Sequence, residues 1–210
     1  AFRSIIATYS KPAGPQVMYT EFVSADGLAR AGEEGREKLM RDLVFAPEQR
    51  PIVAQFFTAT PEHMERAAAL AARLGFDGVD INMGCPDRTI EKQGAGAKLM
   101  LNPTLAQELL AAAKRGAPEL PVSAKIRLGY NKDILDDFLP TLLEAKPAAV
   151  ALHARTRKEM STVPAHWDRV KRAVDIRNEV GSKTFIIGNG DVKDLDDARS
   201  RAAESGADGV

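Results

Sequence analysis

The chain has 210 residues, and its 29 Lys and Arg residues balance 29 Asp and Glu residues, so the formal net charge is zero. This balance excludes nucleic-acid binding through net charge alone, because a basic surface would have to be local. A hydrophobic share of 44% is typical of a globular chain, and no apolar run approaches the ~20 residues of a membrane-spanning helix. The single cysteine excludes an internal disulfide and favours a reducing, cytoplasmic setting without a membrane partner.

Hydrophobic periodicity and turn residues predict helices and strands that alternate along the chain. In chain order we expect a helix at 2–9, a strand at 17–24, a helix at 27–43, a strand at 51–58, a helix at 61–74, a strand at 77–82, a helix at 103–115, a strand at 122–128, a helix at 133–145, a strand at 148–154, a helix at 166–180, a strand at 184–189, a helix at 195–205 and the start of a strand at 206–210. Gly32 and Gly35 lower the helix propensity of 27–43. Thr60, Pro61 and Glu62 supply an N-cap, a proline at the first helical position and an acid in the first turn of the helix at 61–74.

This alternation is typical of a parallel sheet whose strands are connected by helices. No Gly-x-Gly-x-x-Gly follows the first strand, which argues against a dinucleotide-binding Rossmann domain. A parallel barrel of eight βα units usually has ~250 residues. We therefore predict an α/β fold, a (β/α)8 TIM-type barrel that occupies residues 1–210 as one domain and is truncated at both ends.

Polar side chains recur at every second position near the carboxyl ends of five expected strands. They are Gln55, Asp80, Asn82, Ser123, Lys125, Arg127, His153, Arg155, Asn189 and Asp191. Successive strand residues point to opposite faces, so each strand directs its polar set to one side. Because barrel enzymes build their active sites at the carboxyl ends of the strands, we expect these groups to meet at one mouth.

Cys85 stands between Gly84 and Pro86, directly after the strand expected at 77–82. Glycine allows a close approach of the backbone to another group, and proline stiffens the exit from the strand. The small residues at 94–97 follow, and they suit packing against a flat ligand or a neighbouring backbone. A free cysteine is usually a small buried hydrophobe, so the residues alone leave both a packing role and a catalytic role open.

Five ordered segments resemble the tRNA-dihydrouridine synthase family: 82–86, 94–97, 125–129, 152–157 and 188–191. The segment at 19–25 looks like the second strand of that family. The resemblance implies an FMN-dependent barrel that reduces the C5–C6 bond of selected uridines in tRNA, with NADPH as the reductant and no metal. It also implies that a first strand, a phosphate contact on the last strand and a C-terminal helical tRNA-binding domain are absent from these residues.

The resemblance assigns Cys85 as the general acid that protonates uracil C5 while reduced FMN delivers hydride to C6. A thiol with a reference pKa of about 8.5 is mostly protonated at neutral pH, which suits an acid. Lys125 is implied to stabilise negative charge on the reduced flavin, although a strand-end lysine can also extend to solvent. Gln55 and His153 are implied flavin contacts. Their alternatives are a backbone hydrogen bond inside the barrel and an ordinary core histidine.

The end of the last complete strand is a further expected cofactor contact, formed by Asn189, Gly190 and Asp191. Asn-Gly is also a common turn pair, but N–H groups exposed at this corner of a barrel can hold an anion. Three residues are expected to bind substrate, namely Asn82, Arg127 and Arg155; for Arg127, pairing with an acid is the alternative. His63 is expected at the surface and His166 at a helix start, and neither receives a role.

Basic residues occur in the loops on the same rim: Arg88, Lys92, Lys98, Arg155, Arg157 and Lys158. They are either a local surface for the tRNA backbone or ordinary solvated charge. Two other functions remain open, a dihydroorotate-dehydrogenase-like FMN enzyme that acts on a free pyrimidine and a non-catalytic RNA-binding barrel. The dihydrouridine content of tRNA from a deletion strain separates the first of these from a tRNA enzyme, and flavin absorbance of the full-length protein tests the second.

Overall fold

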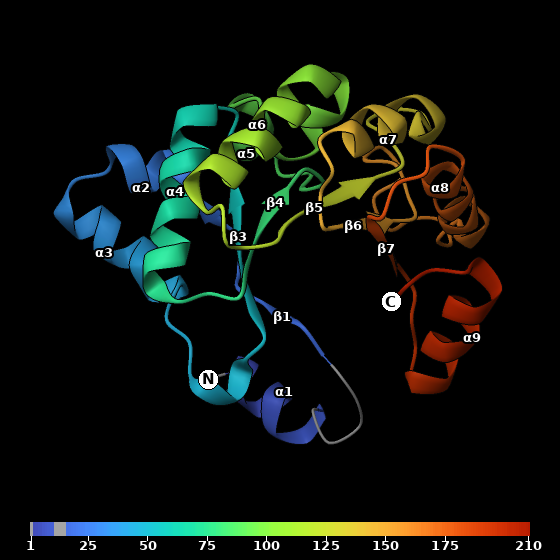
Figure 1. The fold of residues 1–210 in the computed structure, drawn as a ribbon, viewed down its shortest axis with the longest axis horizontal. Helices are drawn as coiled ribbons and strands as arrows, with labels where there is room; N and C mark the ends of the chain where they lie inside the picture. The colour runs from blue at the N-terminus through green and yellow to red at the C-terminus, as the bar shows by residue number, and fades with distance from the viewer. Residues whose placement is uncertain (1, 11–15) are drawn as a thin grey trace.

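The computed structural model describes residues 2–10 and 16–210, and it has one parallel sheet with helices packed along its outer side (Figure 1). The strands are β1 (Met18–Tyr19), β2 (Val23–Ser24), β3 (Ile52–Phe57), β4 (Gly78–Asn82), β5 (Val122–Arg127), β6 (Ala149–His153) and β7 (Phe185–Asn189). The helices are α1 (Phe2–Ser10), α2 (Ala25–Arg30), α3 (Glu33–Asp42), α4 (Pro61–Leu74), α5 (Arg88–Lys92), α6 (Pro103–Gly116), α7 (Leu135–Glu144), α8 (Trp167–Glu179) and α9 (Leu195–Ser205), with 3-10 turns η2 (Pro47–Gln49) and η3 (Gly96–Leu101).

The strands of the described sheet lie in the order β1, β3, β4, β5, β6, β7, and β2 pairs with the carboxyl end of β3. Every pair is parallel. A parallel bridge between Ile187 and Gly209 brings the chain after α9 back beside β7. Neighbours in sequence are thus neighbours in the sheet, with a helix after each strand from β3 onward, as in a TIM-type barrel. The predicted α/β fold of (β/α)8 type is confirmed.

The register of the strand pairs brings the predicted polar positions to neighbouring levels on one face of the sheet, and we call this set the row of polar residues. The aligned pairs are Gln55 with Asp80, Asp80 with Ser123, Asn82 with Lys125, Arg127 with His153, and His153 with Asn189. Because side chains alternate between the two faces of a strand, aligned partners point to the same side. The row therefore collects the polar groups of five strands on the inner face, toward their carboxyl ends.

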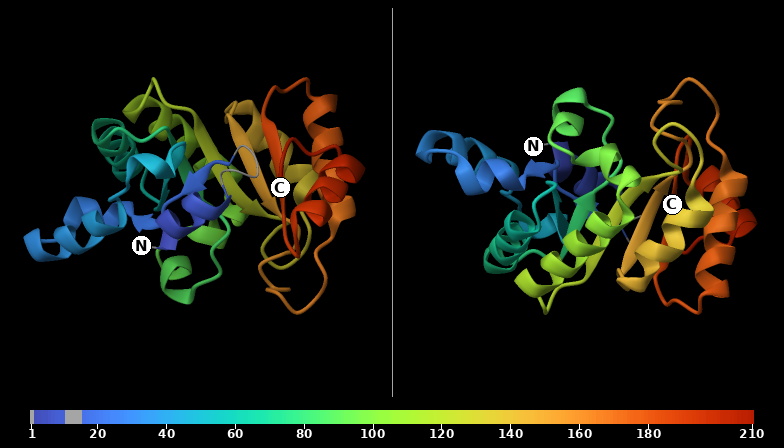
Figure 2. Two further views of the ribbon diagram at one scale, coloured as in Figure 1. Left: turned by 90° about the horizontal axis from the view of Figure 1, so that it is seen from below. Right: turned by 90° about the horizontal axis from the view of Figure 1, so that it is seen from above.

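The intervening strand residues form the other face and are almost entirely removed from solvent. Ala54, Ile81, Ile126 and Leu152 are all 0% exposed, and they belong to one apolar core together with residues of the surrounding helices. Strands buried on both sides are typical of parallel sheets. Figure 2 shows α2 and α3 projecting at one side of the molecule and α8 and α9 lying at the other. Within the described ranges, no helix has both the length and the apolar character needed to cross a membrane.

Two expected elements are each divided in two, and both predictions of a continuous element were wrong. The strand expected at 17–24 consists of β1 and β2, because Thr20 leaves the strand geometry and its hydroxyl accepts a hydrogen bond from the backbone N–H of Gln55 at 3.0 Å. The helix expected at 27–43 is broken where Ala31 and Gly32 take extended backbone angles. Glycine has a low helix propensity, which favours the break at this position.

The other boundaries agree with the expected ones to within about two residues, the usual uncertainty of a helix end, and α9 begins and ends as predicted. Thr60 is the N-cap of α4 by position, but its side chain makes no capping hydrogen bond, so the expected cap is absent. Pro61 occupies the first turn as predicted. The sequence did not predict α5 and η3, which are short and fill the segment between Cys85 and α6.

Candidate active site

A chain of three polar side chains on β3 and β4 leads to the loop that carries Cys85. Gln55 Nε2 donates to Asp80 Oδ2 at 2.7 Å, and Asn82 Nδ2 donates to Gln55 Oε1 at 3.1 Å. The other end of the Asn82 amide, Oδ1, accepts from the backbone N–H groups of Gly84 at 3.1 Å and Cys85 at 2.9 Å. An ionised carboxylate only accepts hydrogen bonds, so Asp80 fixes the direction of both amides. We call Asp80, Gln55 and Asn82 the amide chain.

Asp80 is the buried start of this chain, with 1% of its surface exposed. Ser123 Oγ donates to its second oxygen, Oδ1, at 2.5 Å, so both oxygens accept a hydrogen bond. Burial raises the pKa of the Asp80 carboxyl, while the hydrogen bonds from Ser123 and Gln55 and the charge of Lys125 act in the opposite direction. The sequence placed Asp80 on the polar face without assigning it a role. An acid among the apolar residues of a buried strand was the sequence feature that could have indicated a role for Asp80.

The Cys85 loop is also held from its far side by the small residues that follow it. Ala97 N–H donates to the Cys85 carbonyl oxygen at 2.9 Å. Gly96 has φ +60°, and a Cβ atom there would lie 2.7 Å from the same oxygen and 2.9 Å from Ile90 Cγ2. A side chain at this position would therefore displace the loop. The sequence left open whether the small residues at 94–97 pack against a flat ligand or a neighbouring backbone. Gly96 contacts a neighbouring backbone.

Arg127 braces the same loop from β5. It is 8% exposed, its Nε donates to the Gly84 carbonyl at 2.7 Å, and its Nη1 donates to the Thr156 carbonyl at 3.2 Å. Burial lowers the pKa of the guanidinium, and electrostatic interaction with Cys85 acts in the opposite direction. Its hydrogen bonds within the described chain go to backbone carbonyls, which fits a positioning role better than the expected contact with substrate.

Lys125 lies at the centre of the row of polar residues. Its Nζ donates to Asn189 Oδ1 at 2.8 Å, which joins β5 to the end of β7 across the mouth. Burial lowers the pKa of Lys125 to about 8; the charge of Asp80 raises it, and that of Arg127 lowers it. An ammonium has three donors, so two N–H groups are available beyond the bond to Asn189. Lys125 is therefore still a cation at neutral pH, in a place where a charge is poorly solvated.

A second group of side chains, which we call the arginine cluster, consists of Arg155, His153 and Asp191. Arg155 Nη2 lies 2.7 Å from each carboxylate oxygen of Asp191, and its Nη1 lies 3.1 Å from His153 Nε2. The Arg155 Nε donates to the Val163 carbonyl at 2.6 Å. Arg155 is 6% exposed, and its donors bond to groups within the protein. These contacts favour a positioning role over the expected contact with substrate.

Charge and burial set the protonation states in this cluster. Burial lowers the pKa of His153 to about 4, and the positive charges of Arg127, Lys125 and Arg155 contribute in the same direction. His153 is therefore neutral at pH 7, with Nε2 accepting from Arg155 and the proton on Nδ1. The hydrogen bonds from Arg155 and from the Ala165 backbone lower the pKa of Asp191. Both Asp191 oxygens accept from Arg155, and Oδ2 also accepts from Ala165, so a direct contact of this carboxylate with cofactor stays a prediction.

The turn after β7 is shaped by two residues with positive φ, Gly190 at +128° and Asp191 at +58°. A Cβ atom on Gly190 would lie 2.8 Å from the Ala165 side chain, so the turn needs a glycine. Trp167 Nε1 donates to the Gly190 carbonyl at 2.9 Å. The segment before α8 therefore packs directly on the corner that the sequence assigned to the cofactor.

The basic rim that the sequence predicted is partly neutralised. Arg157 forms two hydrogen bonds with Glu91, at 2.7 and 2.6 Å, and its guanidinium lies 5.1 Å from the Tyr130 ring centre. Arg155 belongs to the arginine cluster. Exposed positive charge on the rim is left to Arg88, Lys92, Lys98 and Lys158. The 66 residues between Arg157 and Glu91 explain why sequence spacing gave no sign of this pair.

The two other histidines form contacts of their own. The prediction that His63 lies at the surface was wrong: its side chain is 13% exposed, and Nδ1 lies 2.5 Å from Asp26 Oδ1. His166 precedes α8 as expected, and its Nε2 lies 3.0 Å from Glu159 Oε1. Among the residues that the structure describes, no group of three or more His, Cys, Asp or Glu side chains is arranged to hold a metal ion.

Comparison with known proteins places this geometry in a family. The model of the family described as dihydrouridine synthase (Dus) matches residues 1–210. A probable tRNA-dihydrouridine synthase of Staphylococcus aureus (strain COL) is 37% identical over 210 residues, which are 100% of this chain and 62% of that protein. Probable tRNA-dihydrouridine synthase 2 of Bacillus subtilis (strain 168) is 36% identical with the same coverage. The chain thus spans about 62% of the length of these curated relatives.

Solved structures resemble the chain in fold. Histamine dehydrogenase from Rhizobium sp. 4-9 superposes with a TM-score of 0.64 and 13% identity, over 98% of this chain and 39% of that one. The old yellow enzyme homologue from Zymomonas mobilis gives a TM-score of 0.57 and 12% identity, over 92% of this chain and 74% of that one. At such low identity the likeness supports the barrel architecture and carries no statement about chemistry.

Proposed function

The chain belongs to the dihydrouridine synthase family, and we propose that it provides the catalytic barrel of an oxidoreductase that reduces the C5–C6 double bond of uridines in tRNA. The observation that carries the proposal is the position of Cys85. Its loop is held by the amide chain on one side and by Arg127 on the other, next to the mouth that contains Lys125 and His153. A tRNA substrate favours a cytoplasmic location.

The donors at the mouth suit FMN, the cofactor that we propose. Lys125 has two N–H groups beyond its bond to Asn189, neutral His153 has an Nδ1–H, and the Gln55 amide retains one N–H and one lone pair. These donors and the one acceptor would match the edge of the flavin ring, which carries acceptors and a donor and gains negative charge on reduction. Bound FMN would supply the hydride that adds to uracil C6, after re-reduction by NADPH.

We assign Cys85 as the general acid. Addition of hydride at C6 places an electron pair on C5, and transfer of the Sγ proton to C5 completes the reduction, leaving a thiolate. A positioned acid contributes ~10²–10⁴-fold to such a step. The Arg127 guanidinium interacts electrostatically with Cys85, so it would stabilise the negative sulfur formed by the transfer. Asn82 would orient the loop through the Gly84 and Cys85 N–H groups rather than bind the base.

For the corner after β7 and for Arg155, we propose more limited roles than the sequence predicted. The backbone N–H groups at the corner of Asn189, Gly190 and Asp191 would hold the phosphate-bearing chain of FMN, because the Asp191 carboxylate is already bonded to Arg155. Arg155 would keep His153 neutral and oriented. These assignments give the arginine cluster a supporting role at the cofactor.

The test is the dihydrouridine content of tRNA. Expression of the full-length protein in a strain that lacks its own dihydrouridine synthases should restore dihydrouridine, measured by mass spectrometry of digested tRNA. A Cys85→Ala variant expressed to the same level should restore far less. Soluble, flavin-bearing protein that restores none but oxidises or reduces a free pyrimidine would favour the dihydroorotate-dehydrogenase-like alternative. Soluble protein without flavin would favour the non-catalytic RNA-binding barrel.

A further inference from the structure

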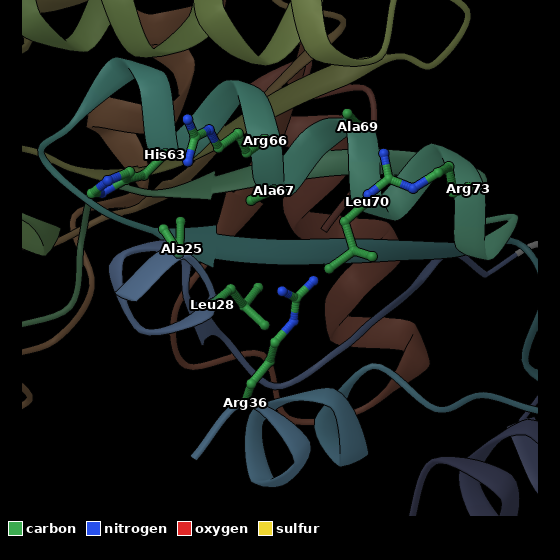
Figure 3. A pocket seen from close by; sticks show the side chains of 10 residues that line it. Ala25, Leu28, Arg36, His63, Arg66, Ala67, Ala69, Leu70 and Arg73 are labelled. Carbon is green, nitrogen blue, oxygen red and sulfur yellow. The ribbon is translucent and has the colours of Figure 1, made fainter. Parts of the chain in front are cut away.

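A groove lies between α2, α3 and α4, and none of the row of polar residues lines it (Figure 3). Its volume is about 260 Å³. Leu28 and Leu70 lie on its floor, and three arginines line it: Arg36 from α3, and Arg66 and Arg73 from α4. His63 closes the end nearest the carboxyl terminus of β3. We call this the outer groove.

The charge of the outer groove is not compensated. Its lining includes no carboxylate, and within residues 2–10 and 16–210 the guanidinium groups of Arg36, Arg66 and Arg73 form no hydrogen bond or ion pair. Asp26 is bonded to His63 and to the Thr58 hydroxyl, so it does not neutralise them. Glu33 and Glu37 of α3 line a neighbouring hollow that Arg36 also lines, and neither of these two acids forms an ion pair with Arg36.

Arginines elsewhere in the described chain behave differently. Those of the carboxyl-terminal helices are paired with acids: Arg169 with Asp133, Arg172 with Asp136, Arg177 with Asp208, Arg199 with Asp196 and Arg201 with Asp197. Seven described arginines have no acid partner, and five of them are on α2, α3 and α4, namely Arg30, Arg36, Arg41, Arg66 and Arg73. Arginines without an acid partner are therefore concentrated on these three helices.

We propose that the outer groove binds phosphate groups of the tRNA backbone, an inference that rests on the proposed function. A guanidinium matches phosphate with a fork of parallel N–H donors. Arg66 and Arg73 are seven residues apart on α4, or ~10 Å at 1.5 Å per residue, and Arg36 faces them from another helix. Cations spread over two turns suit a chain of phosphates better than one small anion.

The position of the groove fits a nucleic acid whose target base enters the mouth. Only three residues separate the end of β3 from the start of α4, and Thr58, Asp26 and His63 form a hydrogen-bonded connection between that strand end and the groove. Nucleotides that leave the mouth over the edge of β3 would reach His63 first and the arginines next. The groove thus extends the tRNA surface to a side of the barrel that the rim residues do not cover.

The experiment is a salt titration of tRNA binding by the full-length protein. The log of the binding constant falls with log salt by about 0.7–0.9 per neutralised phosphate, so the triple variant Arg36→Gln, Arg66→Gln, Arg73→Gln should lose about 2–3 units of slope. The control removes three positive charges elsewhere, with Arg172→Gln, Lys183→Gln and Arg199→Gln, and should keep the wild-type slope. Thermal unfolding checks that both variants are folded.

The outcomes separate the two hypotheses. If the wild-type protein binds tRNA and the triple variant keeps its slope, or loses no more than the control does, the outer groove is not a phosphate site. If the wild-type protein binds no tRNA, the proposed function and this inference both fail. If the triple variant does not fold, the single variant Arg66→Gln, which changes an exposed side chain, should still lose close to one unit of slope; an unchanged slope would overturn the inference.

Discussion

The two sides of the mouth are organised by different forces. On β3 and β4 the amide chain uses one buried carboxyl and two neutral amides to hold the Cys85 loop. On β6 and β7 the arginine cluster holds its loop with a full ion pair, in which Arg155 is 7% and Asp191 41% exposed in their side chains. Lys125 connects the sides, attracted by Asp80 and bonded to Asn189.

The difference shows where each side is vulnerable. A buried hydrogen-bonded chain is shielded from salt, but loss of one member leaves buried donors without acceptors. An ion pair with one exposed partner can be replaced in part by water, but it responds to charge and pH. We therefore expect mutations in the amide chain to affect folding and the Cys85 loop most strongly, and changes at the arginine cluster to act mainly through pH.

The largest expected effect is on stability, from Asp80→Ala. The substitution leaves the Ser123 hydroxyl and the Gln55 amide without their buried acceptor, at about 1–3 kcal/mol for each unsatisfied group. We expect the free energy of unfolding in urea to fall by about 3 kcal/mol. The Arg155–Asp191 pair, in which the Asp191 side chain is 41% exposed, offers the matched control: Asp191→Ala should lower the free energy of unfolding much less than Asp80→Ala does. Equal effects at the two positions would contradict the contrast between the sides.

The next effect concerns Lys125, which belongs to both sides. A hydrogen bond to a charged group contributes about 1.5–3 kcal/mol, so Lys125→Ala should weaken FMN binding at pH 7 by about tenfold or more. Because the pKa of Lys125 is about 8, wild-type affinity should also decline as the pH rises through 8. Fluorescence titration of FMN measures both effects, and the exposed-site variant Lys132→Ala is the control. If the wild-type affinity for FMN does not depend on pH in this way, or if Lys125→Ala binds FMN as tightly as the wild type, Lys125 is not the proposed FMN contact.

The smallest effect is a pH dependence of stability due to His153. Its folded pKa of about 4 lies below the unfolded value of about 6.5, so the unfolded chain binds the proton first as the pH falls. Stability contributed by neutral His153 is therefore complete above pH 6.5 and is lost between pH 6.5 and 4. Urea unfolding across this range should show a slope that is reduced in His153→Gln, which keeps an acceptor for Arg155. Parallel pH curves for the two proteins would contradict the account of the arginine cluster.

The sequence predicted the row of polar residues because the order and direction of parallel strands determine which side chains share a face. Once the strands are located, alternation directs Gln55, Lys125 and His153 to one face, and the βα order brings them to one end. It did not predict which polar groups bond to one another. Asn82 and Arg155 were expected to bind substrate, but Asn82 donates to Gln55 and Arg155 to Asp191, partners that only the folded chain brings near.

Local patterns were weakest where tertiary contacts set the conformation. The segment after Cys85 forms α5 and η3 around Gly96, whose positive φ and contact with the Cys85 carbonyl are not visible in a run of small residues. The outer groove was missed for a similar reason. Arg36 and Arg66 belong to ordinary charged helices, and only the folded chain shows that they line one groove whose lining contains no acid.

The central claim, that Cys85 is the proton donor, is tested most directly by rapid mixing of reduced full-length protein with unmodified tRNA. In the Cys85→Ala variant, FMN binding and reduction by NADPH should be nearly unchanged, whereas reoxidation of the flavin by tRNA should slow by ~10²–10⁴-fold. If Cys85 only packs against its loop, alanine would instead lower stability by about 1 kcal/mol and leave the rate alone. A wild-type rate of reoxidation in the alanine variant would contradict the proposed mechanism.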